Sequence, residues 1–308
     1  MFKKLITILL LPLNAIGAEA WVVQQSDTPV ELNAVTFMLN GRSGWAVGFG
    51  GTVLGTTDGG QTWGRQQSGT PNELLSVYFA PNGLSGWAVG FGGEIITTIN
   101  GGRIWTRQRS GTPNELRSVT FASDGRSGWA VGFGGTILAT SDGGENWLPQ
   151  RSGTLNELRS VSFTSDGQSG WAVGFGGTIL ATFDSGGSWT RQLSGTTKEL
   201  HSVTFMRDGR SGWAVGFGGT ILATTDGGRS WVQQRSGTTA DLRSVCFMPD
   251  GRSGWVVGFG GTILATTDGG QSWLRQQSGT TKNLNSVSFA QEGRSIWTVG
   301  TGGTILSN

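Results

Sequence analysis

The sequence has almost none of the side chains that build metal sites, disulfides or redox centres. Cysteine, histidine and tyrosine occur once each, as Cys246, His201 and Tyr78. One cysteine and one histidine are too few for a mixed cysteine–histidine metal site, a disulfide or a redox-active cysteine pair. We therefore expect no metal and no cofactor.

Charge is scarce as well. Charged residues make up 14% of the 308-residue chain, and the formal net charge is +2. Nucleic-acid-binding domains concentrate basic residues on one face, so we expect no nucleic-acid partner. Glycine is abundant, with 55 residues, but it does not recur at every third position, which excludes a collagen-like chain.

The first 20 residues are predicted to be a secretory signal. A pair of lysines at 3–4 precedes an apolar run at 5–13, and the stretch 18–20, Ala-Glu-Ala, resembles a signal-peptidase site. The run is shorter than the roughly 18 residues that a membrane span needs. We expect cleavage before Trp21, a secreted or periplasmic product, and no stable membrane insertion.

All 14 tryptophans fall into two series with a spacing of 42 residues. The first series comprises Trp21, Trp63, Trp105, Trp147, Trp189, Trp231 and Trp273, and the second Trp45, Trp87, Trp129, Trp171, Trp213, Trp255 and Trp297. Seven copies of this length match the four-stranded blade of a β-propeller, and no window has the 3.6-residue apolar period of a helix.

One copy is enough to predict the strands of a blade. Short β-rich runs predict strands at 116–121, 128–131, 136–140 and 147–151. The Gly-Phe-Gly-Gly stretch at 132–135 is predicted to turn the chain between the second and third strands. It is not a phosphate-binding loop, because such a loop opens a helix and here a strand follows.

The register of the two ends predicts a closed ring. Residues 21–308 number 288, six short of seven periods, and the missing stretch corresponds to the hairpin at 267–272. The strand at 21–25 would then complete the last blade, formed by 284–306. Pairing the first strand with the last removes free sheet edges. We predict an all-β fold, a single seven-bladed β-propeller over 21–308, and a monomer.

A second motif marks the hairpin before the outermost strand. The Asp-box pattern [ST]-x-D-x-G-x-[ST]-W occurs around Asp58 and recurs around Asp226 and Asp268, and around Asp142 with Asn146 in place of its last serine or threonine. The copy around Asn100 lacks the aspartate, and the copy around Asp184 has Ser185 where the others have glycine. A short carboxylate at such a turn can accept several backbone hydrogen bonds. Because the motif repeats symmetrically, we interpret these aspartates as structural.

Sequence position also sorts the charged residues between the two faces of the predicted propeller. The turns between first and second strands carry arginines on one face: Arg42, Arg126, Arg210, Arg252 and Arg294. The segments before the first strands place a ring of carboxylates near the channel mouth of the other face: Glu31, Glu73, Glu115, Glu157, Glu199 and Asp241. Beside that ring lie turn-tip phenylalanines: Phe49, Phe91, Phe133, Phe175, Phe217 and Phe259.

Both a structural and a functional explanation fit these sets. Arginines and carboxylates can pair locally, for example Glu115 with Arg117 or Glu157 with Arg159, and solvated pairs contribute only about 0–1 kcal/mol. The phenylalanines can pack onto the neighbouring blade. Alternatively, the spaced guanidinium groups of the turn arginines, which hold carboxylates in a bidentate fork, form a protein-docking face, with the carboxylate and phenylalanine face as a second candidate.

The repeat G-W-A-V-G-F-G-G-T-I-L-A-T-T-D-G-G-x-x-W resembles that of the photosystem II stability and assembly factor family. The resemblance covers essentially all of 21–308. It implies a seven-bladed propeller on the lumenal side of the thylakoid membrane, with an arginine patch that engages a newly made reaction-centre subunit. Similar Asp-box repeats occur in sialidases, xyloglucanases and other secreted proteins.

No set of residues indicates catalysis. A catalytic site breaks the symmetry of a ring because its groups have different roles, but Tyr78, His201 and Cys246 lie in three different blades, and we interpret them as substitutions tolerated by packing. A sialidase-like mechanism would need Tyr78 as nucleophile, and neither Glu73 nor Glu94 is evidently paired with it. A glycosidase needs two facing carboxylates, and nothing singles out two members of the ring.

Three hypotheses remain at this point. The leading one is a non-catalytic secreted propeller that binds a protein and aids the assembly or stability of a membrane complex. The alternative is a carbohydrate-binding or glycan-hydrolysing Asp-box protein. A third is a repetitive surface protein without a single ligand, which the near-identity of the repeats favours.

Overall fold

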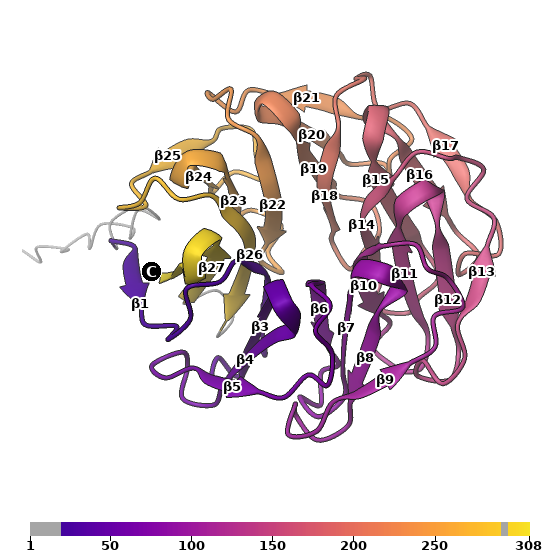
Figure 1. Ribbon diagram of the computed structural model, residues 1–308. Helices are drawn as coiled ribbons and strands as arrows, with labels where there is room; N and C mark the ends of the chain where they lie inside the picture. Colours follow the sequence, from indigo (N-terminus) through magenta and orange to yellow (C-terminus); the bar gives the residue numbers. More distant parts are fainter. Residues whose placement is uncertain (1–19, 291–294) are drawn as a thin grey trace, which may run out of the picture.

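The computed structural model describes residues 20–290 and 295–308, and within these ranges the chain forms seven four-stranded antiparallel sheets. The sheets follow one another around a ring (Figure 1). The predicted seven-bladed β-propeller is therefore confirmed. The predicted signal segment lies outside the described residues except for Ala20.

Each blade has four strands, counted here from the axis outward. The innermost strands, which contact one another between neighbouring blades, are β2 (Leu32–Phe37), β6 (Leu74–Phe79), β10 (Leu116–Phe121), β14 (Leu158–Phe163), β18 (Leu200–Phe205), β22 (Leu242–Phe247) and β26 (Leu284–Ala290). The second strands are β3 (Gly44–Gly48), β7 (Gly86–Gly90), β11 (Gly128–Gly132), β15 (Gly170–Gly174), β19 (Gly212–Gly216), β23 (Gly254–Gly258) and β27 (Ser295–Gly300). The third strands are β4 (Thr52–Thr56), β8 (Ile95–Thr98), β12 (Ile137–Thr140), β16 (Ile179–Thr182), β20 (Thr220–Thr224), β24 (Ile263–Thr266) and β28 (Ile305–Ser307). The outermost strands are β5 (Gly64–Gln66), β9 (Thr106–Gln108), β13 (Leu148–Gln150), β17 (Thr190–Gln192), β21 (Val232–Gln234), β25 (Leu274–Gln276) and β1 (Val22–Gln24).

A single turn of 3-10 helix joins the second strand of each blade to the third. These turns are η1 (Phe49–Gly51), η2 (Phe91–Gly93), η3 (Phe133–Gly135), η4 (Phe175–Gly177), η5 (Phe217–Gly219), η6 (Phe259–Gly261) and η8 (Thr301–Gly303). In the third blade, the sequence-based strands agree with β10 to β13 to within one or two residues at each end. The Gly-Phe-Gly-Gly turn also lies where it is predicted.

The innermost strand of every blade contains a β-bulge. In β10 the pairing with β11 passes from Leu116, opposite Gly132, to Ser118, opposite Val131, so Arg117 is the extra residue. The same shift occurs in the other six blades. Because a bulge bends the strand and re-aims a side chain, this one position differs from the simple alternation of a strand.

The amino-terminal strand closes the ring. β1 pairs with β28 in the register Val22–Ser307, Val23–Leu306 and Gln24–Ile305, and Figure 1 shows β1 beside the carboxyl terminus. The Nε1 atom of Trp21 donates a hydrogen bond of 2.9 Å to Gln276 in the preceding blade. The predicted closure of the last blade by the first strand is confirmed.

Aromatic side chains fill the space between neighbouring blades. Trp45 on β3 stacks on Phe79 of the next blade with ring centroids 3.5 Å apart, and Phe79 meets Trp105 edge-on at 5.8 Å. The indole nitrogens also cross the interface, because Trp45 donates to the carbonyl of Gly101 and Trp105 to the side chain of Gln66. Aromatic pairs contribute about 0.5–1.5 kcal/mol beyond their buried area. Both tryptophan series therefore hold blades together.

The Asp-box aspartates hold their hairpins, as predicted. Asp58 accepts hydrogen bonds from the Thr62 hydroxyl at 2.6 Å, the Thr62 N–H at 3.0 Å and the Thr56 hydroxyl at 2.8 Å. These bonds favour the ionised carboxylate and lower the pKa of Asp58 to about 2. Asn100 accepts the equivalent bonds with its amide oxygen in the second blade. The adjacent Trp63 is buried.

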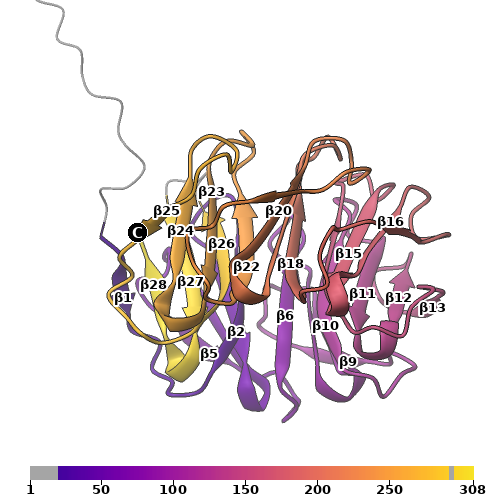
Figure 2. The ribbon, with the colours of Figure 1, turned by 90° about the horizontal axis from the view of Figure 1, so that it is seen from above.

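Hydrogen bonds between turns fix what lies on each face, and Figure 2 shows the ring edge-on. The Phe49 N–H donates to the carbonyl of Glu31 at 3.0 Å, which places the turn-tip phenylalanine and the predicted carboxylate position on one face. The Gly59 N–H donates to the carbonyl of Arg42 at 2.9 Å, which places the turn arginine beside the Asp-box hairpin on the other. The predicted division of the turns between two faces is correct.

Candidate binding site on the propeller axis

The bulge residues of the seven innermost strands meet around the propeller axis. We call them the bulge ring: Asn33, Leu75, Arg117, Arg159, His201, Arg243 and Asn285. All seven line one central cavity of about 400 Å³. Cavities of about 300–1,000 Å³ are typical of small-ligand sites.

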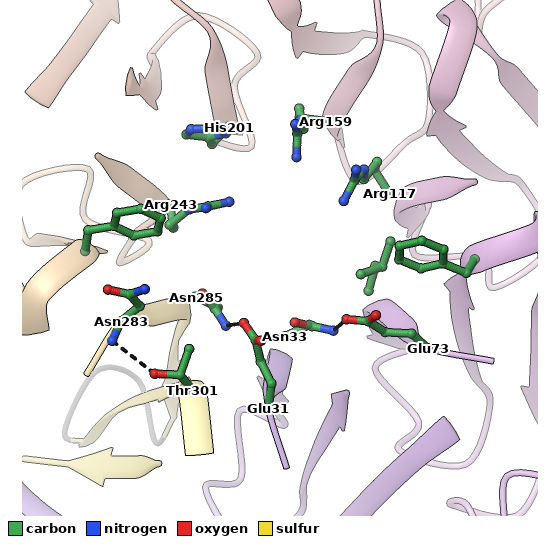
Figure 3. Close-up of a pocket in the computed structure, with 13 residues that line it drawn as sticks. Glu31, Asn33, Glu73, Arg117, Arg159, His201, Arg243, Asn283, Asn285 and Thr301 are labelled. Atoms are coloured by element: carbon green, nitrogen blue, oxygen red, sulfur yellow. Dashed lines mark hydrogen bonds between the residues drawn. The ribbon is translucent and has the colours of Figure 1, made fainter. Parts of the chain in front are cut away.

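Residues from every blade contribute to the wall of this cavity. Besides the bulge ring, it is lined by Glu31, Glu73, Phe91, Phe259, Asn283 and Thr301. Figure 3 shows that the cationic side chains and His201 occupy one side and the two glutamates and the asparagines the other. We call these sides the basic arc (Arg117, Arg159, His201 and Arg243) and the acidic arc (Glu31, Asn33, Glu73 and Asn285).

Two members of the basic arc are neutralised by the predicted carboxylate ring. Arg117 Nε lies 2.8 Å from Glu115 and 2.7 Å from Glu157 of the next blade. Arg159 Nε lies 3.2 Å from Glu157 and 2.7 Å from Glu199. The local pairs anticipated from the sequence are therefore present, and each arginine also bridges to the following blade.

Arg243 differs from these two arginines. Its guanidinium lies over the ring of Phe259, 4.5 Å from the ring centroid. Its Nε is buried without a hydrogen-bond partner among the residues described, as is that of Arg159. Among residues 20–290 and 295–308, however, Arg243 has no carboxylate within 4.0 Å, whereas Arg117 and Arg159 have two each. Burial, followed by the positive charge of Arg159, lowers the pKa of Arg243, although a guanidinium stays protonated in proteins. Arg243 is a charged donor to the cavity that lacks an anionic partner within the described chain.

His201 is the neutral member of the basic arc. Its side chain is only 8% exposed, and its Nδ1 lies 3.4 Å from Glu199 Oε1 without forming a hydrogen bond. Burial, together with the charges of Arg243, Arg159 and Arg117, lowers the pKa of His201 to about 3. The imidazole is therefore uncharged at neutral pH.

The acidic arc is held in place by asparagines rather than by cations. Asn33 Nδ2 donates to Glu73 Oε1 at 2.8 Å, and Asn285 Nδ2 donates to Glu31 Oε1 at 2.8 Å. The same amide nitrogens also donate to the carbonyls of Leu74 and Leu32. These bonds fix both glutamates at the cavity wall, and within the described ranges neither has a cation within 4.0 Å.

The remaining carboxylates of the predicted ring have other roles. Leu75 offers no donor to Glu115 in the next blade, and burial raises the pKa of Glu115. Asp241 accepts a hydrogen bond of 2.9 Å from the Gly218 N–H. In the described part of the chain, no three histidine, cysteine, aspartate or glutamate residues are grouped so that they could hold a metal ion.

The turn-tip phenylalanines surround this mouth and are largely exposed. Five of the six residues are 42–57% exposed: Phe49, Phe91, Phe133, Phe175 and Phe217. Phe259 is more covered because Arg243 lies over it. The turns that carry these side chains contact the innermost strand of the next blade, so both packing on that blade and an exposed apolar surface remain open for them. In blade 1 the turn lies close to Glu31, and this approach requires glycine at position 48. A Cβ on Gly48 would overlap the carbonyl oxygen of Glu31.

The comparisons with known proteins point to one family. A sequence model described as "Photosynthesis system II assembly factor YCF48" matches residues 13–112, 108–199 and 192–277, which is most of the chain. The chain belongs to this family. No curated protein sequence gave a significant match.

Solved structures of the YCF48 family share the fold. One, described as YCF48 bound to D1 peptide, is 24% identical, with a TM-score of 0.77 and coverage of 95% of this chain and 98% of that one. Another, YCF48 from Cyanidioschyzon merolae, is 23% identical, with a TM-score of 0.77 and coverage of 94% and 98%. Within the described ranges, no helix of this YCF48-family chain has the length and apolarity that a membrane crossing requires.

The turn arginines lie on the face opposite the cavity. Arg42, Arg126, Arg210 and Arg252 are exposed at the tips of their turns, whereas Arg294 lies outside the described residues. The structure does not bring them into the central cavity, which instead gathers Arg117, Arg159 and Arg243. That the turn arginines form a docking face stays a prediction.

Two of the unique residues lie away from the site. Tyr78 packs between blades 2 and 3, and burial raises its pKa to about 12. Cys246 is buried between blades 6 and 7, and burial raises its pKa to about 12. Glu94 is held by two bonds of 2.7 Å from Arg107, and Glu73 faces the cavity rather than Tyr78. The arrangement that a sialidase-like mechanism would need is not present among these residues.

Proposed function

We propose that the chain is a non-catalytic binding protein that engages a segment of a membrane-complex subunit in the central cavity. Its membership of the YCF48 assembly-factor family supports a role in assembling or stabilising a photosynthetic reaction-centre complex. The relative described as bound to a D1 peptide supports a peptide of such a subunit as the ligand. The product would be exported, to the periplasm or to the thylakoid lumen of a photosynthetic host.

The observation that carries this proposal is the unsatisfied guanidinium of Arg243. It faces a cavity of about 400 Å³ and lacks an anionic partner among the described residues. An arginine can hold a carboxylate with two parallel hydrogen bonds, and the exposed phenylalanines around the mouth offer apolar contact to the rest of the segment. The site therefore fits a peptide that carries a carboxylate.

Co-purification tests the proposal directly. The tagged full chain is expressed in its source organism, membranes are crosslinked mildly and solubilised, and bound proteins are identified by mass spectrometry. We expect a reaction-centre subunit to be enriched with the wild-type chain. Recovery of no membrane protein after crosslinking would contradict the proposal.

A matched pair of variants assigns the binding face. Arg243→Gln removes a charge from the cavity, and Arg252→Gln removes one from the opposite face of the same blade. We expect Arg243→Gln to lose most of the partner and Arg252→Gln to retain it. The reverse result would show that the turn arginines form the docking face.

A screen for enzymatic activity checks the non-catalytic part of the proposal. Tyr78 packs between blades 2 and 3, burial raises its pKa to about 12, and it does not line the central cavity. We expect the purified chain to be inactive on sialoside and glucan substrates and to bind nothing on a glycan array. Turnover above that of a heat-denatured sample would revive the carbohydrate hypothesis.

A further inference from the structure

Opposite charges without ionic partners face each other across the central cavity. Arg243 has no carboxylate within 4.0 Å, and neither Glu31 nor Glu73 has a cation within that distance among the described residues. By contrast, the positive charges of Arg117 and Arg159 are neutralised by carboxylates. The charged groups that lack a close ionic partner therefore lie on both sides, and Asp241, Glu199 and Glu31 act on Arg243 only from beyond 4.0 Å.

The acidic side is preorganised to accept a donor. The amides of Asn33 and Asn285 fix the Oε1 atoms of Glu73 and Glu31. No donor in the described chain reaches the Oε2 atom of either glutamate. Fixed acceptors lose little conformational entropy when a ligand binds, so this side is built to receive a cation or another hydrogen-bond donor.

His201 lines the cavity on the same side as Arg243, and its Nδ1 lies 3.4 Å from the Glu199 carboxylate. The His201 side chain is 8% exposed, and its Nδ1 makes no hydrogen bond within the described residues. Unsatisfied buried polar atoms cost free energy unless a ligand or water satisfies them. Because His201 Nδ1 lies beside Glu199, Arg243 is the donor of this wall that most needs a ligand acceptor.

We propose that the cavity selects a peptide segment that carries a carboxylate and a cationic side chain together. The carboxylate binds Arg243, and the lysine or arginine of the same segment binds Glu31 and Glu73. This inference rests on the proposed function and adds a requirement for the cation to it. Across a partly enclosed cavity, complementary charges give specificity because the reversed or neutral arrangement leaves buried charges unpaired.

Short synthetic peptides test the proposal with the full folded protein. Acetylated hexapeptides of glycine and alanine carry one lysine and one carboxylate, with two to four residues between them. The carboxylate is either the carboxyl terminus or a glutamate side chain in a carboxyl-amidated peptide, which distinguishes its two sources. Matched peptides have norleucine in place of lysine, or glutamine or an amide in place of the carboxylate. Affinity is measured by calorimetry at low ionic strength.

We expect a peptide with at least one of these spacings to bind. Removing either charge from that peptide should weaken its binding about tenfold. In the Glu31→Gln/Glu73→Gln variant, the lysine and norleucine peptides should bind equally. The Arg243→Gln variant should bind the peptide with the carboxylate and the matched peptide with glutamine or an amide equally. Glu145→Gln, on an exposed Asp-box turn, is the control and should change neither preference.

Three results would overturn the proposal. Wild-type protein could bind the lysine and norleucine peptides equally, the preference for lysine could persist in Glu31→Gln/Glu73→Gln, or no peptide of the set could bind. Thermal unfolding of each variant shows whether the fold is intact, and glutamine keeps the oxygen that the asparagines contact. Failure here with a successful co-purification would leave the proposed function standing and remove only the cation requirement.

Discussion

At the scale of single residues, the bulge position of the innermost strand carries most of the chemical difference between the blades. Its seven occupants are two asparagines, a leucine, three arginines and a histidine, while the neighbouring leucine position is the same in every blade. The fifth position of the strand also varies, among threonine, serine, tyrosine and cysteine, but charged residues occur only at the bulge position. That pattern indicates that packing does not determine the bulge residue. The cavity that these side chains line explains why that position is free to vary.

The effect of pH on stability tests the environment of His201. Its pKa falls to about 3 in the folded chain, so the unfolded chain binds a proton more readily below about pH 6.5. Stability should therefore be constant above that pH and decline as the pH falls toward 3. We expect the wild type to lose about 2 kcal/mol more than His201→Asn between pH 7 and pH 5, measured by urea unfolding.

Asparagine is a suitable replacement for His201 because it occupies the bulge position in blades 1 and 7. Both proteins share all other titrating groups, so the contribution of those groups cancels when the two pH dependences of the unfolding free energy are compared. If the unfolding free energies of the two proteins changed in parallel with pH, the conclusion that His201 is buried and neutral would be contradicted.

The Asp-box aspartates predict a second, more acidic transition. The pKa of Asp58, Asp142, Asp226 and Asp268 is lowered to about 2 by hydrogen bonds from threonine, serine and asparagine groups. Their stabilising effect is complete above about pH 4 and is lost as the pH falls toward 2. We expect a variant with asparagine at all four positions to fold at pH 7 and to lose less stability than wild type between pH 4 and pH 2.

Blade 2 supplies the precedent for that variant, because Asn100 already accepts the Asp-box bonds without a charge. Denaturant midpoints measured at intervals of half a pH unit separate this transition from that of His201. A constant difference between variant and wild type over the whole range would show that ionisation of these aspartates does not stabilise the fold.

At the scale of elements, the sequence predicts the blade well and the site only in part. Strands, turns and Asp-box hairpins follow from alternation and from glycine positions, which are local properties. The carboxylate positions and the phenylalanine tips could also be placed, because they lie at fixed distances from a turn. The bulge could not be predicted, since it depends on the pairing of β10 with β11, and without it Arg117 is one more polar residue of an alternating strand.

The missed residues nevertheless leave a signal in the sequence. Comparison of the seven copies at the position of Arg243 shows the mixture of arginine, histidine, asparagine and leucine described above. His201 was interpreted as a substitution tolerated by packing, yet it lines the cavity. The symmetry argument that identifies a catalytic site applies equally to a binding site, and it is the variable position, rather than the unique residues, that locates it.

The turn between the second and third strands gives a prediction about backbone conformation. Gly50 and Gly51 both have positive φ, of 63° and 69°, but a Cβ on Gly50 would meet nothing within 4 Å, whereas one on Gly51 would overlap the carbonyl oxygen of Thr70. We expect Gly50→Ala to cost about 1–2 kcal/mol from backbone strain alone. Gly51→Ala should cost clearly more, as measured by chemical unfolding.

The two glycines are adjacent and undergo the same chemical change, so the difference between the variants isolates the overlap with Thr70. Equal losses of stability in Gly50→Ala and Gly51→Ala would mean that the turn relaxes to remove the overlap at no cost in free energy. Because the turn also carries Phe49 at the rim of the cavity, peptide binding by Gly51→Ala would report whether that relaxation reaches the site.

At the scale of the whole molecule, a nearly symmetric shell encloses an asymmetric centre. Stacked tryptophan–phenylalanine pairs occur at six of the seven blade interfaces, so these six are stabilised in a similar way. The cavity instead combines one residue from each innermost strand, and a change in a single blade alters it without disturbing the shell. Such a fold can change its ligand preference by point substitutions at the bulge ring while its stability stays nearly constant.

Closure of the ring through β1 makes a circular permutant the sharpest test of this architecture. In the permutant, residues 29–308 are followed by the hexapeptide of 267–272 and then by 21–28, so that β1 follows β28 through the kind of hairpin found in blade 6. The contact between β1 and β28 becomes local, and the entropy cost of closing a long loop disappears. We expect a thermal midpoint equal to or above that of wild type, while a control that ends at residue 308 without 21–28 should unfold earlier because its β28 edge is exposed. If the permutant failed to unfold cooperatively, or resembled the truncated control, the seam would depend on more than the three residue pairs between these strands.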